Sequence, residues 1–275
     1  MNAGAGFYFD GSVLAEEIMR TAASELIGFY DGPLGGLAAA FVGDKLSEAW
    51  GDAHGLCVAG FGYSSPYLGR FNQATKRVAL MPEGLGVMRD EGVPMARVGD
   101  ALWPLPNESL DRLLIVHGLE EAPNPRRLLR EAWRVLADDG LMIVVCTNRR
   151  GLWALAERTP FGAGRPYSRT QLDALLRGAM FTPTAYAQAL HFPPTGHEAL
   201  MRLAGAWERL GDALTALPVL LPSLAGVNLI EARKGLAAPV SGSKAEVFGP
   251  VFAGAGLKPV QRSARSSERG AADRT

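Results

Sequence analysis

The stretch that decides the fold of this chain reads Gly55-Leu56-Cys57-Val58-Ala59-Gly60-Phe61-Gly62-Tyr63-Ser64-Ser65-Pro66. The apolar run Leu56–Ala59 ends at two closely spaced glycines, which predicts a buried strand followed by a tight turn. Ser65 is a favourable N-cap, and Pro66 suits the first helical position, where a missing N–H costs nothing. A strand, a glycine turn and a helix N-terminus let a nucleotide-like ligand approach bare backbone. The stretch therefore predicts a site for an adenosine-containing cofactor.

Composition sets wider bounds on the protein. The 275 residues suffice for one large α/β domain with additions, and 48% of them are apolar. Basic and acidic residues both number 28, which argues against nucleic acid as the main partner. Cys57 and Cys146 fall in predicted buried strands without zinc-site spacing, as expected in a reducing compartment. No secretory signal is visible in the first ten residues, and we expect a cytoplasmic protein.

Apolar periodicity outlines the remaining elements. Residues 12–50 form two predicted helices, with a stripe of Val13, Ile18, Ala22, Leu26 and Phe29 and a break at Tyr30–Gly35. Further helices are predicted at 125–137 after the cap Asn124, at 169–178 after the cap Ser168, and from His197 to Leu217. The alternation with apolar strands indicates a mostly parallel sheet covered on both faces. The predicted strands are Leu56–Ala59, Arg77–Met81, Ala96–Val98, Leu113–Val116, Leu141–Cys146, Thr184–Leu190 and Gly226–Ala232.

Four segments follow one another in a recognisable order. They are Gly60-Phe61-Gly62, then Gly99-Asp100-Ala101-Leu102-Trp103-Pro104-Leu105-Pro106-Asn107-Glu108-Ser109-Leu110-Asp111, then Val116-His117-Gly118-Leu119-Glu120-Glu121, and finally Leu129-Arg130-Glu131-Ala132-Trp133-Arg134-Val135-Leu136-Ala137-Asp138-Asp139-Gly140-Leu141. The set resembles the class I S-adenosylmethionine-dependent methyltransferase family, in particular its small-molecule methyltransferase-domain group. The likeness covers roughly residues 55–147, and Tyr167–Leu172 extends it weakly.

The resemblance implies a seven-stranded, mostly parallel, Rossmann-like α/β sheet with helices on both faces. It also implies an N-terminal helical extension and a helical insertion before the last strand. We expect the extension or lid at 1–50, the methyltransferase domain at 51–235 with its insertion at about 193–225, and an irregular, partly disordered tail at 236–275. The long apolar stretch Ala213–Ile230 contains Pro218 and Pro222, so we expect no membrane span there.

The resemblance also implies a cofactor site for S-adenosylmethionine, with S-adenosylhomocysteine as the product. Its residues would be Gly60, Phe61, Gly62, Tyr63, Met81, Asp100, Ala101, Leu102 and His117. Asp100 would accept a hydrogen bond from the adenine amino group, between apolar walls from Ala101 and Leu102, while His117 closes the floor. No metal is expected. His117 and Tyr167 are candidate catalytic residues, whereas Glu120 is more simply the N-terminal charge of a helix.

The sequence departs from the family pattern at three positions. Val58 replaces an acid that orients the methionine end, Ser64 replaces the third glycine, and Met81 stands where an acid binds the ribose, with Glu83 two residues later. Each lost charge-assisted hydrogen bond is worth roughly 1.5–3 kcal/mol, so cofactor affinity is expected to fall.

Three functions follow, in order of preference. The first is methyl transfer to a small-molecule acceptor, which needs positioning more than a catalytic triad. The second is a methyltransferase-like protein with weak or lost cofactor binding that acts as a regulatory or protein-binding partner. The third, a nicotinamide oxidoreductase, lacks the Tyr-x-x-x-Lys pair that a short-chain dehydrogenase uses. The expected partners are a small-molecule acceptor and a protein partner or second copy, without nucleic acid.

Overall fold

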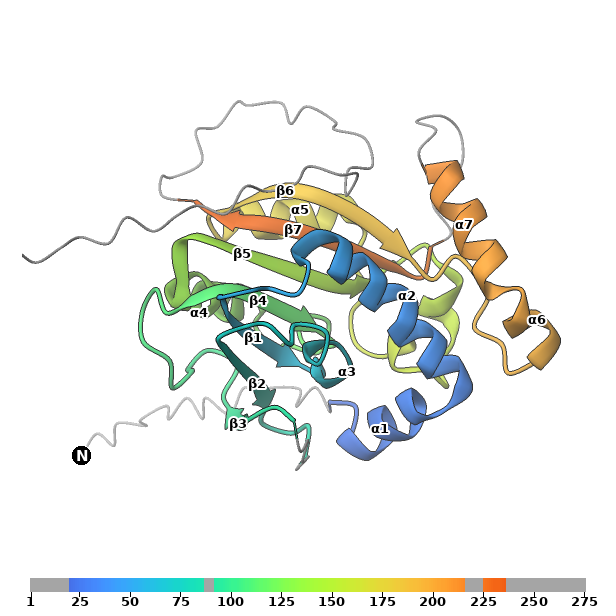
Figure 1. The fold of residues 1–275 in the computed structure, drawn as a ribbon, viewed down its shortest axis with the longest axis horizontal. Coiled ribbons are helices and arrows are strands. Elements are labelled where there is room, and N and C mark those ends of the chain that lie inside the picture. The colour runs from blue at the N-terminus through green and yellow to red at the C-terminus, as the bar shows by residue number, and fades with distance from the viewer. Residues whose placement is uncertain (1–19, 87–91, 216–224, 236–275) are drawn as a thin grey trace, which may run out of the picture.

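A computed structural model describes residues 20–86, 92–215 and 225–235. Its centre is a seven-stranded sheet in the order β3-β2-β1-β4-β5-β7-β6, visible in Figure 1. The strands are β1 (Cys57–Gly62), β2 (Lys76–Pro82), β3 (Met95–Val98), β4 (Leu110–Val116), β5 (Leu136–Thr147), β6 (Phe181–Ala189) and β7 (Val227–Lys234). Strands β1 to β5 pair in parallel, and β7 runs antiparallel between β5 and β6. The predicted mostly parallel α/β sheet is confirmed.

The strand order reverses between β1 and β4, which are neighbours in the sheet but not in the sequence. Chains that leave such a pair turn to opposite sides and open a crevice at the carboxyl ends of the strands. The loops after β1, β3 and β4 meet at this edge, and they carry most of the residues expected to bind the cofactor.

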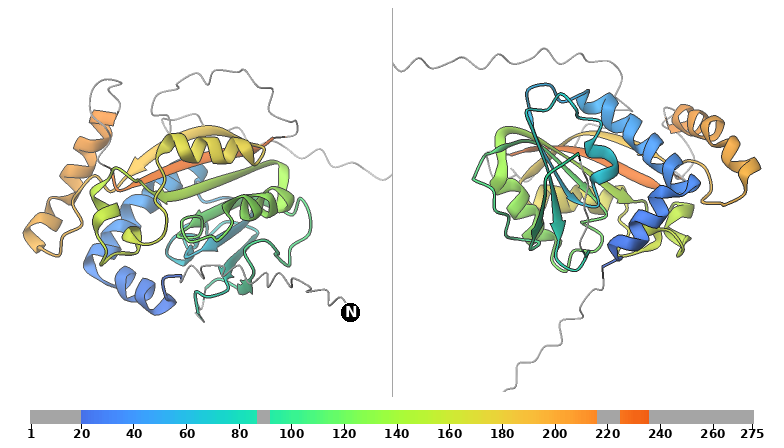
Figure 2. Two further views of the ribbon diagram at one scale, coloured as in Figure 1. Left: turned by 180° about the vertical axis from the view of Figure 1, so that it is seen from behind. Right: turned by 60° about the horizontal axis from the view of Figure 1, so that its bottom comes forward.

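Helices cover both faces of the sheet, as Figure 2 shows. One face is packed against α1 (Ala23–Asp31), α2 (Pro33–Trp50) and α3 (Ser65–Leu68), through Leu26, Val42 and Leu46 among others. The other face is packed against α4 (Pro125–Val135) and α5 (Arg169–Gly178). Neighbouring residues of β1 alternate between the two cores, since Val58 lies in the first and Ala59 in the second.

The caps of the two central helices follow their sequences. The side chain of Asn124 accepts a hydrogen bond from the Arg127 backbone N–H, and Pro125 occupies the first turn of α4. Ser168 and Gln171 form a complete capping box at the start of α5. Both predicted helix starts are confirmed. The helix predicted at 125–137 ends two residues early at Val135, because Leu136 already has extended backbone and begins β5.

The decisive stretch differs in detail from its prediction. Strand β1 continues through Gly60 and Phe61 to Gly62, because both pair in register with β2 and β4. Helix α3 is only four residues long and begins at Ser65, so Ser64 rather than Ser65 is its cap residue. The Ser64 side chain makes no capping hydrogen bond. The helix that begins here is therefore a single turn.

The N-terminal helices and the insertion also differ from expectation. In α1 the buried face is Ala23, Leu26 and Tyr30, whereas Ala22 is exposed; Val13 and Ile18 lie outside the described residues. The helix expected from His197 to Leu217 is divided into α6 (Glu198–Arg202) and α7 (Ala204–Thr215). The tail expected from residue 236 is outside the described residues.

No single helix in the described ranges has the length and hydropathy of a membrane span. Together α1 and α2 reach that length and composition, but they bend by 88° at the break between them.

Candidate functional site

The turn after β1 is shaped by its own neighbours. Gly62 has φ +83°, and a Cβ there would lie 2.1 Å from the Val116 carbonyl oxygen of β4. The Tyr63 backbone N–H donates to the same oxygen at 2.8 Å. A Cβ on Gly60 would lie 2.1 Å from Ser64 Oγ. Neither position has room for a Cβ, because other atoms of the protein approach too closely, so both must be glycine. The backbone at the edge of the sheet is therefore not covered by side chains of these two residues.

Phe61 and Met81 lie in the interior. Phe61 is fully buried and stacks on Trp103, with ring centroids 5.1 Å apart. Met81 is buried near the end of β2 and belongs to the core on the α1–α2 face. Glu83, two residues later, is exposed, and its backbone N–H donates to the Val98 carbonyl. Neither residue places a buried carboxylate at the end of β2.

Asp100, at the end of β3, is held by a residue from the segment before α1. Its Oδ1 lies 2.5 Å from an Arg20 guanidinium nitrogen, and the Arg20 side chain is 4% exposed against 22% for Asp100. The next residue, Thr21, donates to Glu121 Oε1 from its backbone N–H at 3.2 Å and from its hydroxyl at 2.5 Å. The segment before α1 therefore crosses the loops that follow β3 and β4.

The two residues after Asp100 differ in exposure. Ala101 is half-buried, whereas the Leu102 side chain is 79% exposed. An isolated β-bridge joins Gly99 to Leu102 and closes this turn. The apolar wall expected from Leu102 points into solvent in this structure.

His117 follows β4 with a positive φ of +48°, which is unusual for a residue with a side chain. Its Nε2 shares a hydrogen bond of 2.8 Å with the Tyr30 hydroxyl, which lies 3.2 Å from the Tyr67 hydroxyl. The His117 ring contacts Phe161 with centroids 4.8 Å apart. Burial lowers the pKa of His117 to about 4, so the imidazole is neutral at pH 7.

Tyr167 lies apart from His117. It is half-buried against the core on the α4–α5 face, whereas the Tyr30 ring that contacts His117 belongs to the core on the opposite face. Burial raises the pKa of Tyr167 to about 12. The structure does not bring the two candidate catalytic residues together.

Glu120 is the residue that sequence reasoning underrated. It lies in a turn rather than at a helix start, and it is buried. Its Oε1 accepts the Thr147 backbone N–H at 2.9 Å, and burial raises its pKa to about 7. The available signal was its place beside Glu121 directly after a buried strand, where parallel sheets bind ligands.

Unsatisfied polar atoms gather at this edge of the sheet. In the part of the chain that the structure describes, buried atoms without a hydrogen-bond partner include Arg20 Nη1, Ser64 Oγ, Glu120 Oε2, Glu121 Oε2 and Thr147 Oγ1. Burying such atoms without a partner costs free energy, and protein interiors avoid it except where a ligand or water completes the set. The edge formed by the ends of β1, β4 and β5 is therefore suited to a polar ligand.

Comparison with known proteins shows what the strands that form this edge are similar to. Residues 56–144 match the family model described as a methyltransferase domain, which spans β1 to most of β5. This part of the chain is similar to the methyltransferase-domain family. An uncharacterized Escherichia coli protein, YafS, is 30% identical over 152 residues, which are 52% of this chain and 57% of that protein. The chain thus matches little more than half the length of that relative.

Solved methyltransferase structures share the fold. A Thermotoga maritima S-adenosylmethionine-dependent methyltransferase, described as a possible histamine N-methyltransferase, matches with a TM-score of 0.54 at 20% identity. The match covers 80% of this chain and 99% of that one. A methyltransferase from Aquifex aeolicus matches with a TM-score of 0.51 at 14% identity, covering 78% and 100% of the two chains. A putative Haloferax volcanii methyltransferase, solved with the activator Trm112, matches with a TM-score of 0.53 at 14% identity. The match covers 77% of this chain and 97% of that one.

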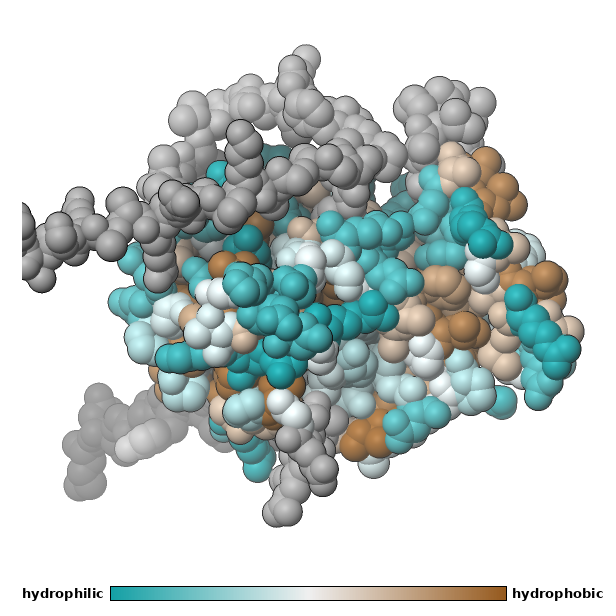
Figure 3. Space-filling model, in the orientation of Figure 1, coloured by the Kyte–Doolittle hydropathy of each residue, from teal (hydrophilic) through white to brown (hydrophobic). Residues whose placement is uncertain are grey.

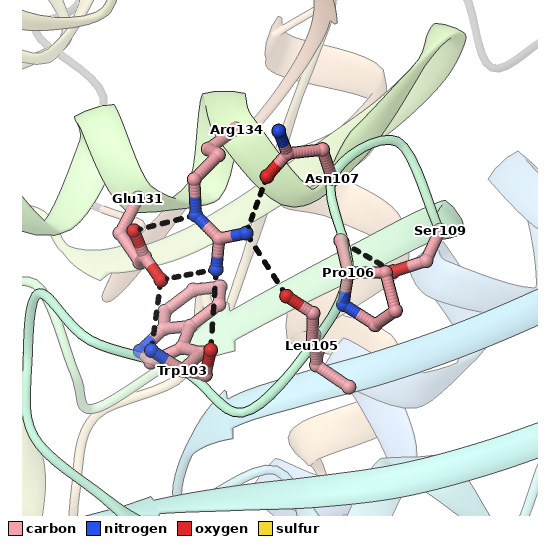
Figure 4. A network of polar contacts seen from close by, with 7 residues as sticks. All are labelled: Trp103, Leu105, Pro106, Asn107, Ser109, Glu131 and Arg134. Carbon is pink, nitrogen blue, oxygen red and sulfur yellow. Dashed lines mark hydrogen bonds and ion pairs between the residues drawn. The ribbon is translucent and has the colours of Figure 1, made fainter.

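The second and fourth of the quoted sequence segments meet in one polar network, drawn in Figure 4. Arg134 of α4 donates to both Glu131 oxygens at 2.6 and 3.0 Å, and to Asn107 Oδ1 at 2.7 Å. It also donates to the carbonyls of Trp103 and Leu105. Glu131 in turn accepts the Trp103 backbone N–H at 2.8 Å. This network ties the loop after β3 to α4.

Proposed function

We propose that this protein transfers a methyl group from S-adenosylmethionine to a small-molecule acceptor. The observation that carries the proposal is the set of buried, unsatisfied polar atoms on the segments that meet at the carboxyl edge of β1, β4 and β5. Ligands of open α/β sheets bind at this position, where the strand order reverses. The family match covers β1 to most of β5, the same part of the chain.

The residues at this edge suit the adenine and methionine parts of the cofactor better than its ribose. The backbone of Gly62 and Tyr63 would border the methionine and ribose, and Asp100 would accept from the adenine amino group. Before it can bind adenine, Asp100 must give up its ion pair with Arg20. No carboxylate fills the usual ribose position, because Met81 is buried there and Glu83 is exposed. We therefore expect weaker cofactor binding than a site with both acids would give.

When bound, the cofactor supplies a sulfonium methyl group that a lone pair on the acceptor can displace. The residues of this chain position the acceptor and exclude water. His117 has a pKa of about 4 and shares a hydrogen bond with Tyr30, so it is a weak base that is suited to hold Tyr30 rather than to take a proton from the acceptor. Tyr167 lies on the α4–α5 face of the sheet, so its only role would be to line the pocket for the acceptor.

We also infer a reducing, cytoplasmic location. Cys57 and Cys146 are both free thiols, and burial raises the pKa of Cys146 well above its ordinary value. A buried thiol with a raised pKa is a poor nucleophile, so Cys146 is structural.

The test is titration of the purified protein with S-adenosylhomocysteine in a calorimeter. The wild type should bind, and Asp100→Ala should weaken binding by roughly tenfold to a hundredfold, because a hydrogen bond to a charged group is lost. Asp139→Ala, at an exposed carboxylate on the sheet's other end, is the control and should bind like the wild type. An absence of binding by the wild type at millimolar ligand would contradict the proposal.

A further inference from the structure

Glu120 is a buried carboxyl group at the candidate site with one oxygen satisfied and one not. Charged side chains normally lie at the surface, as the teal residues over much of Figure 3 do, whereas Glu120 is 3% exposed. Its Oε1 accepts the Thr147 backbone N–H at 2.9 Å, and its Oε2 has no hydrogen-bond partner among the described residues. Because one oxygen is fixed to the end of β5, the other is held in place and left for a ligand.

Thr147 supplies a second polar atom of the same kind. It is the last residue of β5 and is 1% exposed, yet its Oγ1 also lacks a hydrogen-bond partner in the described ranges. The segment after β5 returns over both residues. There the Arg165 backbone N–H donates to the Glu120 carbonyl at 2.9 Å, and the Tyr167 backbone N–H donates to the Thr147 carbonyl at 3.2 Å. Glu120 and Thr147 are therefore held in fixed positions, and we call them the Glu120–Thr147 pair.

The pair lies on the side of the crevice away from Asp100. The strands run in the order β3-β2-β1-β4-β5, so three strands separate the end of β3, which carries Asp100, from the end of β5. In the proposed function the adenine lies at Asp100 and the methionine at Gly62 of β1. The Glu120–Thr147 pair is then left for the methyl acceptor.

The other titratable groups around Glu120 add negative charge or none. The next residue, Glu121, is also buried, and its Oε2 has no partner in the part of the chain that the structure describes. Tyr30, Cys146 and Tyr167 interact with Glu120 as well. Burial raises the pKa of each of these two hydroxyls and of the thiol, so all three are neutral at pH 7.

The nearby arginines do not offset these carboxyl groups. Arg20 is paired with Asp100, and Arg165 is exposed to solvent. Neither forms an ion pair with Glu120 among the described residues. Buried charges are stable only when they are paired, so the free oxygens of Glu120 and Glu121 suit a positively charged ligand and would repel an anion.

We propose that the methyl acceptor is an amine, held by its N–H groups at the Glu120–Thr147 pair, and that Glu120 takes its proton. This inference rests on the proposed methyl transfer. An ammonium group has N–H donors for both Glu120 Oε2 and Thr147 Oγ1, and it neutralises a buried carboxylate. A phenol is less suited, because the loss of its proton would leave a second anion beside Glu121.

In the reaction, the Glu120 carboxylate takes one proton from the ammonium group and so frees the lone pair on nitrogen. This pair forms the new nitrogen–carbon bond, while the carbon–sulfur bond of the sulfonium breaks and leaves its electrons on sulfur. The positive charge thus passes from sulfur to the product amine, and the proton on Glu120 passes to water. Burial raises the pKa of Glu120 to about 7, so the carboxyl group can both accept and release a proton near neutral pH.

The experiment is calorimetric titration of the protein, saturated with S-adenosylhomocysteine, with benzylamine and with 4-methylphenol, which are probes of equal size. The wild type should bind benzylamine more tightly. Glu120→Gln keeps the shape of the side chain and should weaken benzylamine binding by roughly tenfold to a hundredfold, because a hydrogen bond to a charged group is lost. Thr147→Val keeps the backbone N–H and should weaken it by roughly two- to tenfold. The control Asp139→Asn, at an exposed carboxylate on the sheet's other end, should bind like the wild type.

Two further measurements distinguish Glu120 from a residue that only shapes the pocket. Benzylamine affinity of the wild type should rise between about pH 6 and about pH 8 as Glu120 ionises, and Glu120→Gln should lose this rise. Transfer of a tritiated methyl group to benzylamine should fall in Glu120→Gln by a further factor of roughly a hundred or more, because the base is lost as well.

Three results would overturn the inference. They are tighter binding of 4-methylphenol than of benzylamine, no benzylamine binding to the S-adenosylhomocysteine complex, and equal benzylamine affinity in the wild type and Glu120→Gln. A loss of transfer no larger than the loss of binding would overturn the role of Glu120 as the base. Failure of the wild type to bind S-adenosylhomocysteine itself would instead contradict the proposed function on which the inference rests.

Discussion

Two polar regions of this protein, both built from family motifs, differ in how well their atoms are satisfied. Around Arg134, the guanidinium and the Glu131 carboxylate find partners in each other, in Asn107 and in the backbone of the loop after β3. Around the ends of β1, β4 and β5, buried atoms such as Ser64 Oγ and Glu120 Oε2 have no partner among the described residues.

The difference separates two roles within one set of motifs. Charged groups that are satisfied by one another stabilise the fold, as around Arg134, where only Trp103 Nε1 lacks a partner, whereas a set of unsatisfied buried groups costs stability and is kept for binding. The Arg134 network is therefore structural, and the edge of the sheet is the part left open to a ligand. Substitutions in the two regions should affect stability with opposite signs.

The largest effect is expected from Arg134→Met. The substitution leaves the buried Glu131 carboxylate without its cation, and breaking such a pair costs roughly 3–5 kcal/mol. Urea unfolding should show this loss in the free energy of unfolding. Arg130→Met, at an exposed arginine of the same helix, is the matched control and should change stability by less than about 0.5 kcal/mol. Equal effects of both variants would mean that the network is not structural.

The second prediction has the opposite sign. Because the pKa of Glu120 is raised to about 7 by burial, the folded wild type binds a proton that the unfolded chain releases near pH 4.5. The stabilisation that comes from the protonated Glu120 carboxyl is therefore fully present below pH 4.5. It is lost, and the free energy of unfolding falls, as the pH rises through 7. Glu120→Gln removes this loss and should raise the free energy of unfolding at pH 8 by about 3 kcal/mol, with little change at pH 4.

The measurement is urea unfolding at a series of pH values. Glu157→Gln, at an exposed carboxyl, is the control and should leave the pH dependence of the wild type intact. If the stability of Glu120→Gln varied with pH in parallel with that of the wild type, Glu120 would be ionised in the folded protein. The contrast between the satisfied Arg134 network and the unsatisfied edge of the sheet would then be weaker.

The smallest effect concerns the ion pair that covers Asp100. Arg20→Met removes the partner that competes with an adenine amino group for Asp100. The Arg20 side chain is only 4% exposed, and the desolvation of such a mostly buried pair offsets most of its attraction, so affinity for S-adenosylhomocysteine should rise by only about two- to fivefold. Calorimetry measures the change, with Arg70→Met, which breaks an ion pair to Asp44 on the protein surface, as the control. Weaker binding by Arg20→Met would instead make Arg20 part of the site.

Much of the fold could be predicted because its signals are local. Each of the seven predicted strands exists, and the caps Asn124 and Ser168 work as expected, since apolar runs and capping side chains act within a few residues. The errors lie at boundaries. Strand β1 runs on through Gly60 because pairing with β2 and β4 outweighs the turn preference of glycine.

The succession of strands and helices along the chain and the mostly parallel sheet were thus determined by the sequence alone, because periodicity and motif spacing are written along the chain. Only the tertiary structure decided that Arg20 meets Asp100 across 80 positions, and that Tyr30 meets His117 across 87. It also decided that Glu120 is buried. The physical reason is that burial and side-chain partners depend on which distant segments the closed fold brings together, and no local pattern encodes that.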